Sequence, residues 1–239
     1  MLKAVLFDLD GTLLPMDQNT FMKDYFGRLI RRLAPLGYTP EGFLAAMKAG
    51  IAAMVKNNGS RTNEEAYWDA YTAVSGKEIL NHMSVFEDFY EHEFDQVAAV
   101  CGFNPKAAEL VHDLQAKGIR VILATNPLFP RIATQKRIRW AGLTPEDFEL
   151  YTTYEDIGTC KPNPDYYREV LTRAGLDAAD CIMVGNDVAE DMMAGAKAGL
   201  QGFLLTDCLI NTPNADVNDY PHGSFKELKA YLTQLIEEA

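Results

Sequence analysis

The sequence predicts an α/β protein: a parallel sheet covered by helices on both faces, with a helical domain inserted after the first strand. Beyond residue 100, short apolar segments typical of buried strands alternate with amphipathic helical segments. Residues 17–100 instead show helical periodicity and no convincing strand. We therefore expect an α/β core made of residues 1–16 and 101–239, and an α-helical cap domain made of residues 17–100.

Five segments have the character of buried strands, namely residues 4–8, 120–125, 150–154, 181–185 and 202–206. The core helices expected between and after them span residues 105–117, 129–141, 164–174, 188–198 and 224–238. Glycines such as Gly118, Gly142 and Gly175 follow these helices, where glycine commonly ends a helix. The cap is expected to contain four helices, at residues 20–33, 40–55, 63–74 and 85–97.

The charge balance limits the partners that the protein can have. The chain carries 34 acidic and 22 basic residues and a net charge of -12. Nucleic acid and anionic membranes are therefore not expected as partners, because phosphate backbones need clustered Lys and Arg. A small phosphorylated metabolite needs only a local positive site and stays possible.

Cysteine usage and apolar runs indicate the compartment. The four cysteines form no CxxC pair, which argues against a zinc site or a disulfide framework. No run is long enough to span a membrane, and the first apolar run is short and ends in aspartates, unlike a signal peptide. We expect a cytoplasmic protein, either a monomer or a homodimer.

Asp8 and Asp10 are the most informative residues of the chain. They follow the apolar run 4–7 and precede the turn Gly11-Thr12, so both side chains should project into the crevice at the end of the first strand. Two nearby carboxylates repel each other unless a cation or a shared proton relieves the repulsion. Mg²⁺ is the expected cation, because it prefers oxygen ligands and keeps positions for water and phosphate.

Other strand ends carry complementary groups. Thr125 and Asn126 follow the second strand, Lys161 precedes a helix, and Asn186 and Asp187 follow the strand at 181–185. Asp187 and Asp191 have i, i+4 spacing and share one face of a helical turn. Ligands of open parallel sheets bind at the carboxyl ends of the strands. These groups therefore favour a metal-assisted phosphoryl-transfer site.

This arrangement resembles the haloacid dehalogenase-like (HAD) hydrolase superfamily, which has four ordered motifs. Asp8-Leu9-Asp10-Gly11-Thr12 is similar to the first motif, Thr125 to the second and Lys161-Pro162 to the third. Gly185-Asn186-Asp187 with Asp191 is similar to the fourth, although many relatives have Gly-Asp at this point. The resemblance implies a Rossmann-like three-layer core, and the insertion resembles the helical cap that lies between motifs one and two in one subfamily.

The resemblance also implies roles for these residues. Asp8 would be the nucleophile that becomes a transient aspartyl phosphate, and Asp10 the general acid and then base. Mg²⁺ would be held by the Asp8 and Asp187 carboxylates and the Asp10 backbone carbonyl. The oxygens of the phosphate would be bound by Thr125, the N–H of Asn126, and Lys161. Asp191 would orient Lys161 or a metal-bound water, and Asn186 would bind water at the site.

Ordinary structural roles are the alternatives for several of these residues. Asp187 could be only a helix cap, Thr125 and Asn126 could only shape a turn, and Lys161 could be a solvated surface charge. In the cap, Asn58 or Arg61 of the polar loop at residues 57–63 could contact the leaving group of a substrate. The same loop could equally be a plain turn in which Thr62 or Asn63 caps the next helix.

The favoured function is a Mg²⁺-dependent phosphatase that acts on a small phosphomonoester. A sugar-phosphate phosphomutase is the first alternative, since the family's mutases share all four motifs. A 2-haloacid dehalogenase is disfavoured, because displacement of halide needs neither the acid Asp10 nor Mg²⁺. A non-catalytic binding protein is disfavoured by the intact set of Asp8, Asp10, Lys161 and Asp187. The motifs do not identify the substrate.

Overall fold

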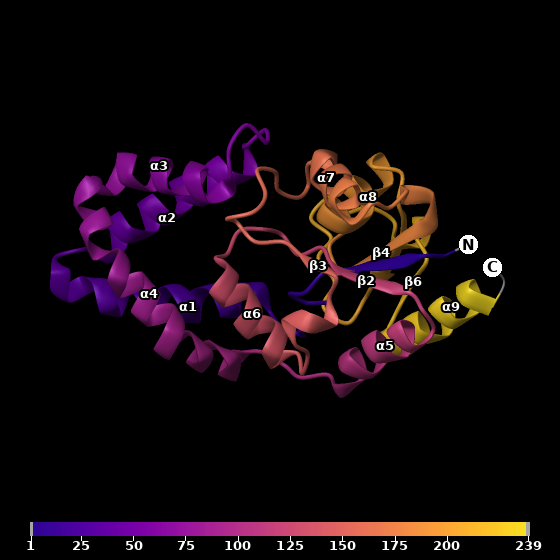
Figure 1. Cartoon of the computed structure of the whole chain (residues 1–239). Coiled ribbons are helices and arrows are strands. Elements are labelled where there is room, and N and C mark those ends of the chain that lie inside the picture. The colour runs from indigo at the N-terminus through magenta and orange to yellow at the C-terminus, as the bar shows by residue number, and fades with distance from the viewer. Residues whose placement is uncertain (1, 238–239) are drawn as a thin grey trace.

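The computed structural model describes residues 2–237 and contains a six-stranded, fully parallel sheet (Figure 1). In chain order, the strands are β1 (Ala4–Phe7), β2 (Arg120–Leu123), β3 (Leu150–Tyr151), β4 (Cys181–Gly185), β5 (Gln201–Leu205) and β6 (His222–Gly223). Across the sheet, they lie in the order β3-β2-β1-β4-β5-β6. β1 lies at the centre, with Ala4 opposite both Arg120 of β2 and Cys181 of β4. The end of β1 is therefore flanked by the ends of β2 and β4.

Helices cover both faces of the sheet, and each face has its own apolar cluster. Val5 and Phe7 of β1 pack toward α5 (Pro105–Ala116), α6 (Arg131–Trp140) and α9 (Phe225–Glu237). Ala4 and Leu6 pack toward α7 (Pro164–Ala174) and α8 (Ala194–Lys197) on the other face. All four side chains of β1 are fully buried, as expected for the central strand of a covered parallel sheet. The prediction of a three-layer α/β core is confirmed.

Four helices lie together on the far side of the molecule from the sheet (Figure 1). They are α1 (Gln18–Leu33), α2 (Pro40–Val55), α3 (Asn63–Ser75) and α4 (Met83–His92), and we call them the cap helices. The side chains of Asp17, Thr39 and Thr62 accept backbone N–H groups at the starts of α1, α2 and α3. Aromatic side chains of these helices pack against one another.

The fourth cap helix differs from the prediction of one helix at residues 85–97. α4 ends at His92, where the N–H of Glu93 donates to the carbonyl of Phe89. A tighter 3-10 segment follows (Phe94–Val100) and buries Phe94 and Val97. The change of helix type explains why the periodicity suggested a single, longer element.

The prediction of one α-helix at residues 188–198 was also wrong in helix type. A π-helix (Val188–Met193) comes first, followed by the short α8. The Asp187 carbonyl accepts the N–H of both Asp191 and Met192, which widens the turn. Strand β6, at the edge of the sheet, has only two residues and was not predicted.

Within residues 2–237, none of the helices combines the length and the apolar character needed to cross a bilayer.

Candidate active site

Lys161 lies at the centre of a buried charge cluster at the strand ends. Its Nζ donates to Asp8 Oδ1 at 2.9 Å and to Asp191 Oδ1 at 2.7 Å. The side chain of Lys161 is fully buried. Asp8 continues β1, and its backbone N–H donates to the carbonyl of Val184 in β4. The fold thus brings together an aspartate of the first motif, the lysine of the third and an aspartate of the fourth.

Burial and charge oppose each other in this cluster. Burial by itself would lower the pKa of Lys161, but Asp191 and Asp8 raise it well above its ordinary value. Burial raises the pKa of Asp8 to about 7, although the charge of Lys161 opposes that shift. Lys161 is therefore held as a cation, and its charge favours the ionised form of Asp8 against the effect of burial.

The turn after β1 places Thr12 beside both Asp8 and Asn186, which follows β4. Thr12 Oγ1 donates to Asn186 Oδ1 at 3.1 Å and also lies 3.4 Å from Asp8 Oδ2. Asn186 Nδ2 donates to the carbonyl of Cys208 at 2.7 Å, which fixes the amide. Gly11 permits this close approach, because it has a φ of 89° and a Cβ there would collide with the Asn186 side chain.

Asp10 forms an ion pair with Arg137 of α6. Arg137 is 1% exposed, and its guanidinium carbon lies 4.1 Å from the centre of the Phe129 ring. Burial raises the pKa of Asp10 above its ordinary value, whereas Arg137 and then Lys161 lower it. Asp10 Oδ1 is buried and has no hydrogen-bond partner among the described residues. Such an atom is costly to bury, so it is suited to bind an incoming group.

Asp187 and Asp191 have different tasks at the start of the π-helix. Asp187 Oδ1 accepts the N–H groups of Ala189 and Glu190 at 2.8 and 2.9 Å, which is a helix cap. Asp191 turns inward and accepts from Lys161 and from the N–H of Asp187. Capping uses one carboxylate oxygen of Asp187 and leaves the other for a ligand.

The turn after β2 is held through its backbone. The Thr125 carbonyl accepts from Thr152 Oγ1 at 2.6 Å and from the Tyr166 hydroxyl at 2.8 Å. Asn126 Nδ2 donates to Glu190 Oε2 at 2.9 Å, and Asn126 Oδ1 is buried with no partner in the described part of the chain. Burial raises the pKa of Glu190 to about 8, against the opposing charge of Lys161.

The donor set at the end of β1 suits Mg²⁺. Asp8 binds Lys161 with one oxygen, and among residues 2–237 its other oxygen has only the long contact from Thr12. That oxygen, the second oxygen of Asp187 and the backbone carbonyl of Asp10 are the type of ligand that Mg²⁺ prefers. Among residues 2–237, no group of three or more His, Cys, Asp or Glu side chains is arranged to hold a metal ion. The expected site therefore depends on the Asp10 carbonyl, and it remains a prediction.

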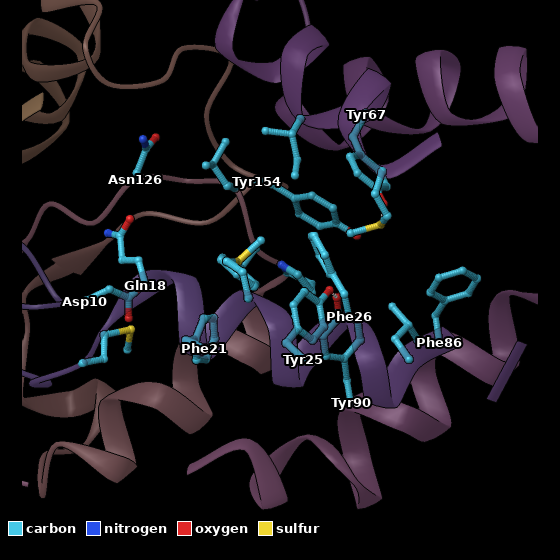
Figure 2. A pocket seen from close by; sticks show the side chains of 18 of the residues that line it. Asp10, Gln18, Phe21, Tyr25, Phe26, Tyr67, Phe86, Tyr90, Asn126 and Tyr154 are labelled. Carbon is cyan, nitrogen blue, oxygen red and sulfur yellow. Dashed lines mark hydrogen bonds between the residues drawn. The ribbon is translucent and has the colours of Figure 1, made fainter. Parts of the chain in front are cut away.

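A cavity of about 230 Å³ extends from these strand ends into the cap (Figure 2). Asp10, Gln18 and Asn126 lie at one end of it, and aromatic side chains of the cap helices such as Phe26 and Phe86 lie at the other. The cavity therefore connects the polar groups of the core with the interior of the cap.

The polar loop of the cap contacts the core, but through a different residue from those expected. Asn58 and Arg61 do not line the cavity: Asn58 Oδ1 accepts the Ser60 N–H, and Arg61 pairs with Asp69 at the surface. Thr62 forms a capping box with Glu65, as the alternative reading of the loop proposed. We do not retain Asn58 and Arg61 as substrate-binding candidates.

Asn63 is the residue of this loop that reaches the core. It is fully buried, and its Nδ2 donates to the carbonyls of Thr159 and Pro127 at 3.2 and 3.4 Å. The loops that contain these carbonyls also carry Lys161 and Asn126. Two backbone hydrogen bonds also join the cap loop to the core segment before Lys161. The Gly59 N–H donates to the Gly158 carbonyl, and the Asn63 N–H donates to the Ile157 carbonyl.

A family model described as haloacid dehalogenase-like hydrolase matches residues 2–199. The chain therefore belongs to this family and is a hydrolase, as the motifs predicted. It is 25% identical over 221 residues to a glyceraldehyde 3-phosphate phosphatase of Methanothermobacter thermautotrophicus, covering 86% of each chain. It is 27% identical over 213 residues to a ribulose-1,5-bisphosphate 5-phosphatase of Halopiger xanaduensis, covering 86% of this chain and 85% of that one.

The same fold occurs in solved structures. A HAD phosphatase from Thermococcus onnurineus superimposes with a TM-score of 0.59 at 17% identity, covering 97% of this chain and 98% of the other. This likeness supports the α/β core with inserted cap helices as one shared architecture.

Several residues at the site carried no signal in the sequence. Arg137 lies on a helix with no motif, and nothing in the sequence links it to Asp10, which is 127 residues away. Glu190 stands between Asp187 and Asp191, so its nearness to the site was readable, but its bond to Asn126 was not. Phe129 was predicted only as the start of a helix, and Asn63 only as a possible helix cap.

Proposed function

We propose that the protein is a Mg²⁺-dependent phosphatase that hydrolyses a small phosphomonoester through an aspartyl-phosphate intermediate on Asp8. The observation that carries this proposal is the buried Lys161 bound to Asp8, next to a cavity that Asp10 lines. A fixed cation beside a carboxylate nucleophile is what attack on a negatively charged phosphoryl group needs. The curated relatives named above are phosphatases, which supports the same reaction class.

In the first half-reaction, an oxygen of Asp8 attacks phosphorus while the bond from phosphorus to the leaving oxygen breaks. Asp10 donates a proton to that oxygen, so the alcohol leaves neutral. In the second half-reaction, Asp10 accepts a proton from the water that attacks the aspartyl phosphate. Inorganic phosphate then leaves and Asp8 is restored. Arg137 holds one oxygen of Asp10 and so orients the other for both proton transfers.

The charge of the phosphoryl group is balanced by groups from several strand ends. Lys161, Thr125 and the N–H of Asn126 bind its oxygens in this proposal, and Asp191 positions Lys161. Mg²⁺, held by Asp8, Asp187 and the Asp10 carbonyl, supplies further positive charge when bound. The cap helices exclude water from the cavity during attack and open for release of the alcohol.

Substitution of the nucleophile tests the proposal. Asp8→Asn should lower kcat for an aryl phosphate by at least about a thousand-fold, because the amide cannot form the intermediate. Asp113→Asn, an exposed aspartate paired with Lys229, is the matched control and should keep full activity. Chelation by EDTA should abolish wild-type turnover. Appreciable activity of Asp8→Asn would contradict the proposed nucleophile, and turnover unchanged by EDTA would contradict the metal.

Product analysis separates the phosphatase from a phosphomutase. With a hexose phosphate, a phosphatase releases inorganic phosphate, whereas a mutase moves the phosphoryl group to another hydroxyl of the same sugar. Formation of an isomeric sugar phosphate would replace the proposal with the mutase reading.

A further inference from the structure

The cavity under the cap helices is mostly apolar. Only four of the described residues that line it carry a carboxylate or an amide, namely Asp10, Gln18, Asn126 and Glu190. The others are aromatic rings, aliphatic side chains, methionines and a proline, contributed by the cap helices and by the segment at residues 128–130. Figure 2 shows that Asp10, Gln18 and Asn126 gather at one end of the cavity. The part of a substrate that extends from the phosphate into the cap therefore meets hydrocarbon and ring faces.

The tyrosine hydroxyls of the cavity are largely used by cap neighbours. The hydroxyls of Tyr25 and Tyr90 lie 2.5 Å apart and share a hydrogen bond, and the Tyr67 hydroxyl donates to Met47 Sδ at 2.8 Å. Burial raises the pKa of Tyr25 to about 12, so this residue stays neutral. Trp68 Nε1 is buried without a partner among the described residues and is one free donor of the cavity. A sugar or polyol placed here would lose its bonds to water and could regain only a few of them, so most of its hydroxyls would be buried unpaired.

Anionic groups on the alcohol would lack a counter-charge in this cavity. No lysine, arginine or histidine is among the described residues that line it. Arg137 lies against the Phe129 ring and is paired with Asp10, and Lys161 is paired with Asp8 and Asp191. Asp10 and Glu190, which do line the cavity, are acidic. A carboxylate or a second phosphate would thus be buried without compensation.

We propose that the substrate is the phosphomonoester of an uncharged alcohol whose body is an aromatic or similarly apolar ring. This inference rests on the proposed function and names the substrate class of the same site. The cavity has room for such a group, since apolar cavities of about 150 Å³ in other proteins take up benzene. Continuity of the cavity with Asp10 assigns it to the leaving alcohol, whose oxygen Asp10 protonates.

A matched pair of esters tests the inference on the wild-type enzyme. Phenethyl phosphate and phosphoglycolate are both primary alkyl phosphates, but one carries a phenyl ring and the other a carboxylate. With Mg²⁺ present, kcat/KM should be at least about tenfold higher for phenethyl phosphate, which corresponds to 1.4 kcal/mol. Equal values, or a preference for phosphoglycolate, would overturn the inference.

Filling the cavity tests whether it is the binding site of the ring. Ile51 of α2 lines the cavity, so Ile51→Trp adds bulk there and should raise KM for phenethyl phosphate about tenfold. Methyl phosphate has no ring to place there, so its kcat/KM should change by less than about twofold. Leu44→Trp is the control, because Leu44 lies on the same helix, is 39% exposed and does not line the cavity. Equal losses with both esters, or with both variants, would speak against the cavity as the ring site.

Binding separates failure of this inference from failure of the proposed function. Calorimetry with two non-hydrolysable compounds, phenethylphosphonate and phosphonoacetate, requires no turnover. Tight binding of phenethylphosphonate alone, with no ester hydrolysed, would refute the phosphatase and support the cavity assignment. Hydrolysis of phosphoglycolate that depends on Asp8, with weaker binding of phenethylphosphonate than of phosphonoacetate, would uphold the phosphatase and overturn the assignment.

Discussion

At the carboxyl end of β1, buried charged side chains are paired with partners of opposite charge, whereas the cavity under the cap helices offers mainly rings and hydrocarbon. Lys161 contacts Asp8 and Asp191, and Arg137 contacts Asp10. In the cap, by contrast, Tyr25, Phe89 and Phe94 pack ring against ring. The two regions meet at Asp10, which belongs to the charge cluster and lines the cavity.

This difference indicates that the charge cluster determines catalysis and stability, and that the cap cavity determines which substrate fits. Charge pairs in a buried site are directional, so removal of one partner leaves the other uncompensated and costs several kcal/mol. Apolar contacts are non-directional and add up over area, so single changes cost less and mainly alter which group fits. We expect core substitutions to change kcat and stability, and cap substitutions to change KM and substrate preference.

The largest effect is expected for Lys161→Met. It leaves Asp8 and Asp191 buried without their shared cation, which should cost about 3–5 kcal/mol of the free energy of unfolding and lower kcat at least about a thousand-fold. Chemical denaturation and steady-state kinetics measure the two effects. Lys229→Met breaks an exposed pair with Asp113 and, as control, should cost less than about 1 kcal/mol. Wild-type stability of Lys161→Met would show that the charge cluster is not what organises the site.

A smaller effect is expected for Arg137→Met, which keeps an apolar stem near Phe129 and removes the ion pair with Asp10. We expect kcat to fall about 10- to 100-fold for alkyl phosphates, whose alcohols need the proton of Asp10, and less for aryl phosphates. The informative measurement is the slope of log kcat against the pKa of the leaving alcohol. Arg137→Lys should restore part of the lost kcat. A uniform loss for all esters would indicate a structural role instead of positioning of the acid.

The comparison between core and cap also explains what could be predicted from the sequence. Asp8, Asp10 and Asp187 follow strand ends, where a parallel sheet gathers the groups that bind ligands. Lys161 instead precedes α7, so only its motif pointed to the site. The central strands were predictable because buried parallel strands are continuous apolar runs. The two-residue edge strand β6 has no such run.

The remaining features depend on distant contacts or on local geometry with no sequence pattern. Arg137 meets Asp10 only through the packing of α6. The π-helix at Val188–Met193 arises from how Asp187 and Asp191 are held, which hydrophobic periodicity does not report. The cavity is equally hidden, since cap aromatics that line a pocket and cap aromatics that fill a core have the same spacing in the chain.

The smallest effect is expected at the contact between cap and core. Asn63→Ala removes hydrogen bonds to the carbonyls of Pro127 and Thr159 and should cost about 1–2 kcal/mol of stability, with a rise in KM of a few-fold. Asn58→Ala in the same loop affects only a local turn and should change stability by less than about 0.5 kcal/mol. Thermal unfolding of both variants checks this. Equal losses of stability in Asn63→Ala and Asn58→Ala would show that the hydrogen bonds of Asn63 to the core do not stabilise the contact between cap and core.

Direct detection of the intermediate tests the central claim, namely that Asp8 is the attacking group. Enzyme mixed with an aryl phosphate and Mg²⁺ is quenched in acid within milliseconds, digested and analysed by mass spectrometry. The account predicts a phosphoryl adduct on Asp8 that appears before the steady state and is absent from Asp8→Asn. Rapid turnover with no adduct, or with the adduct on another residue, would contradict it.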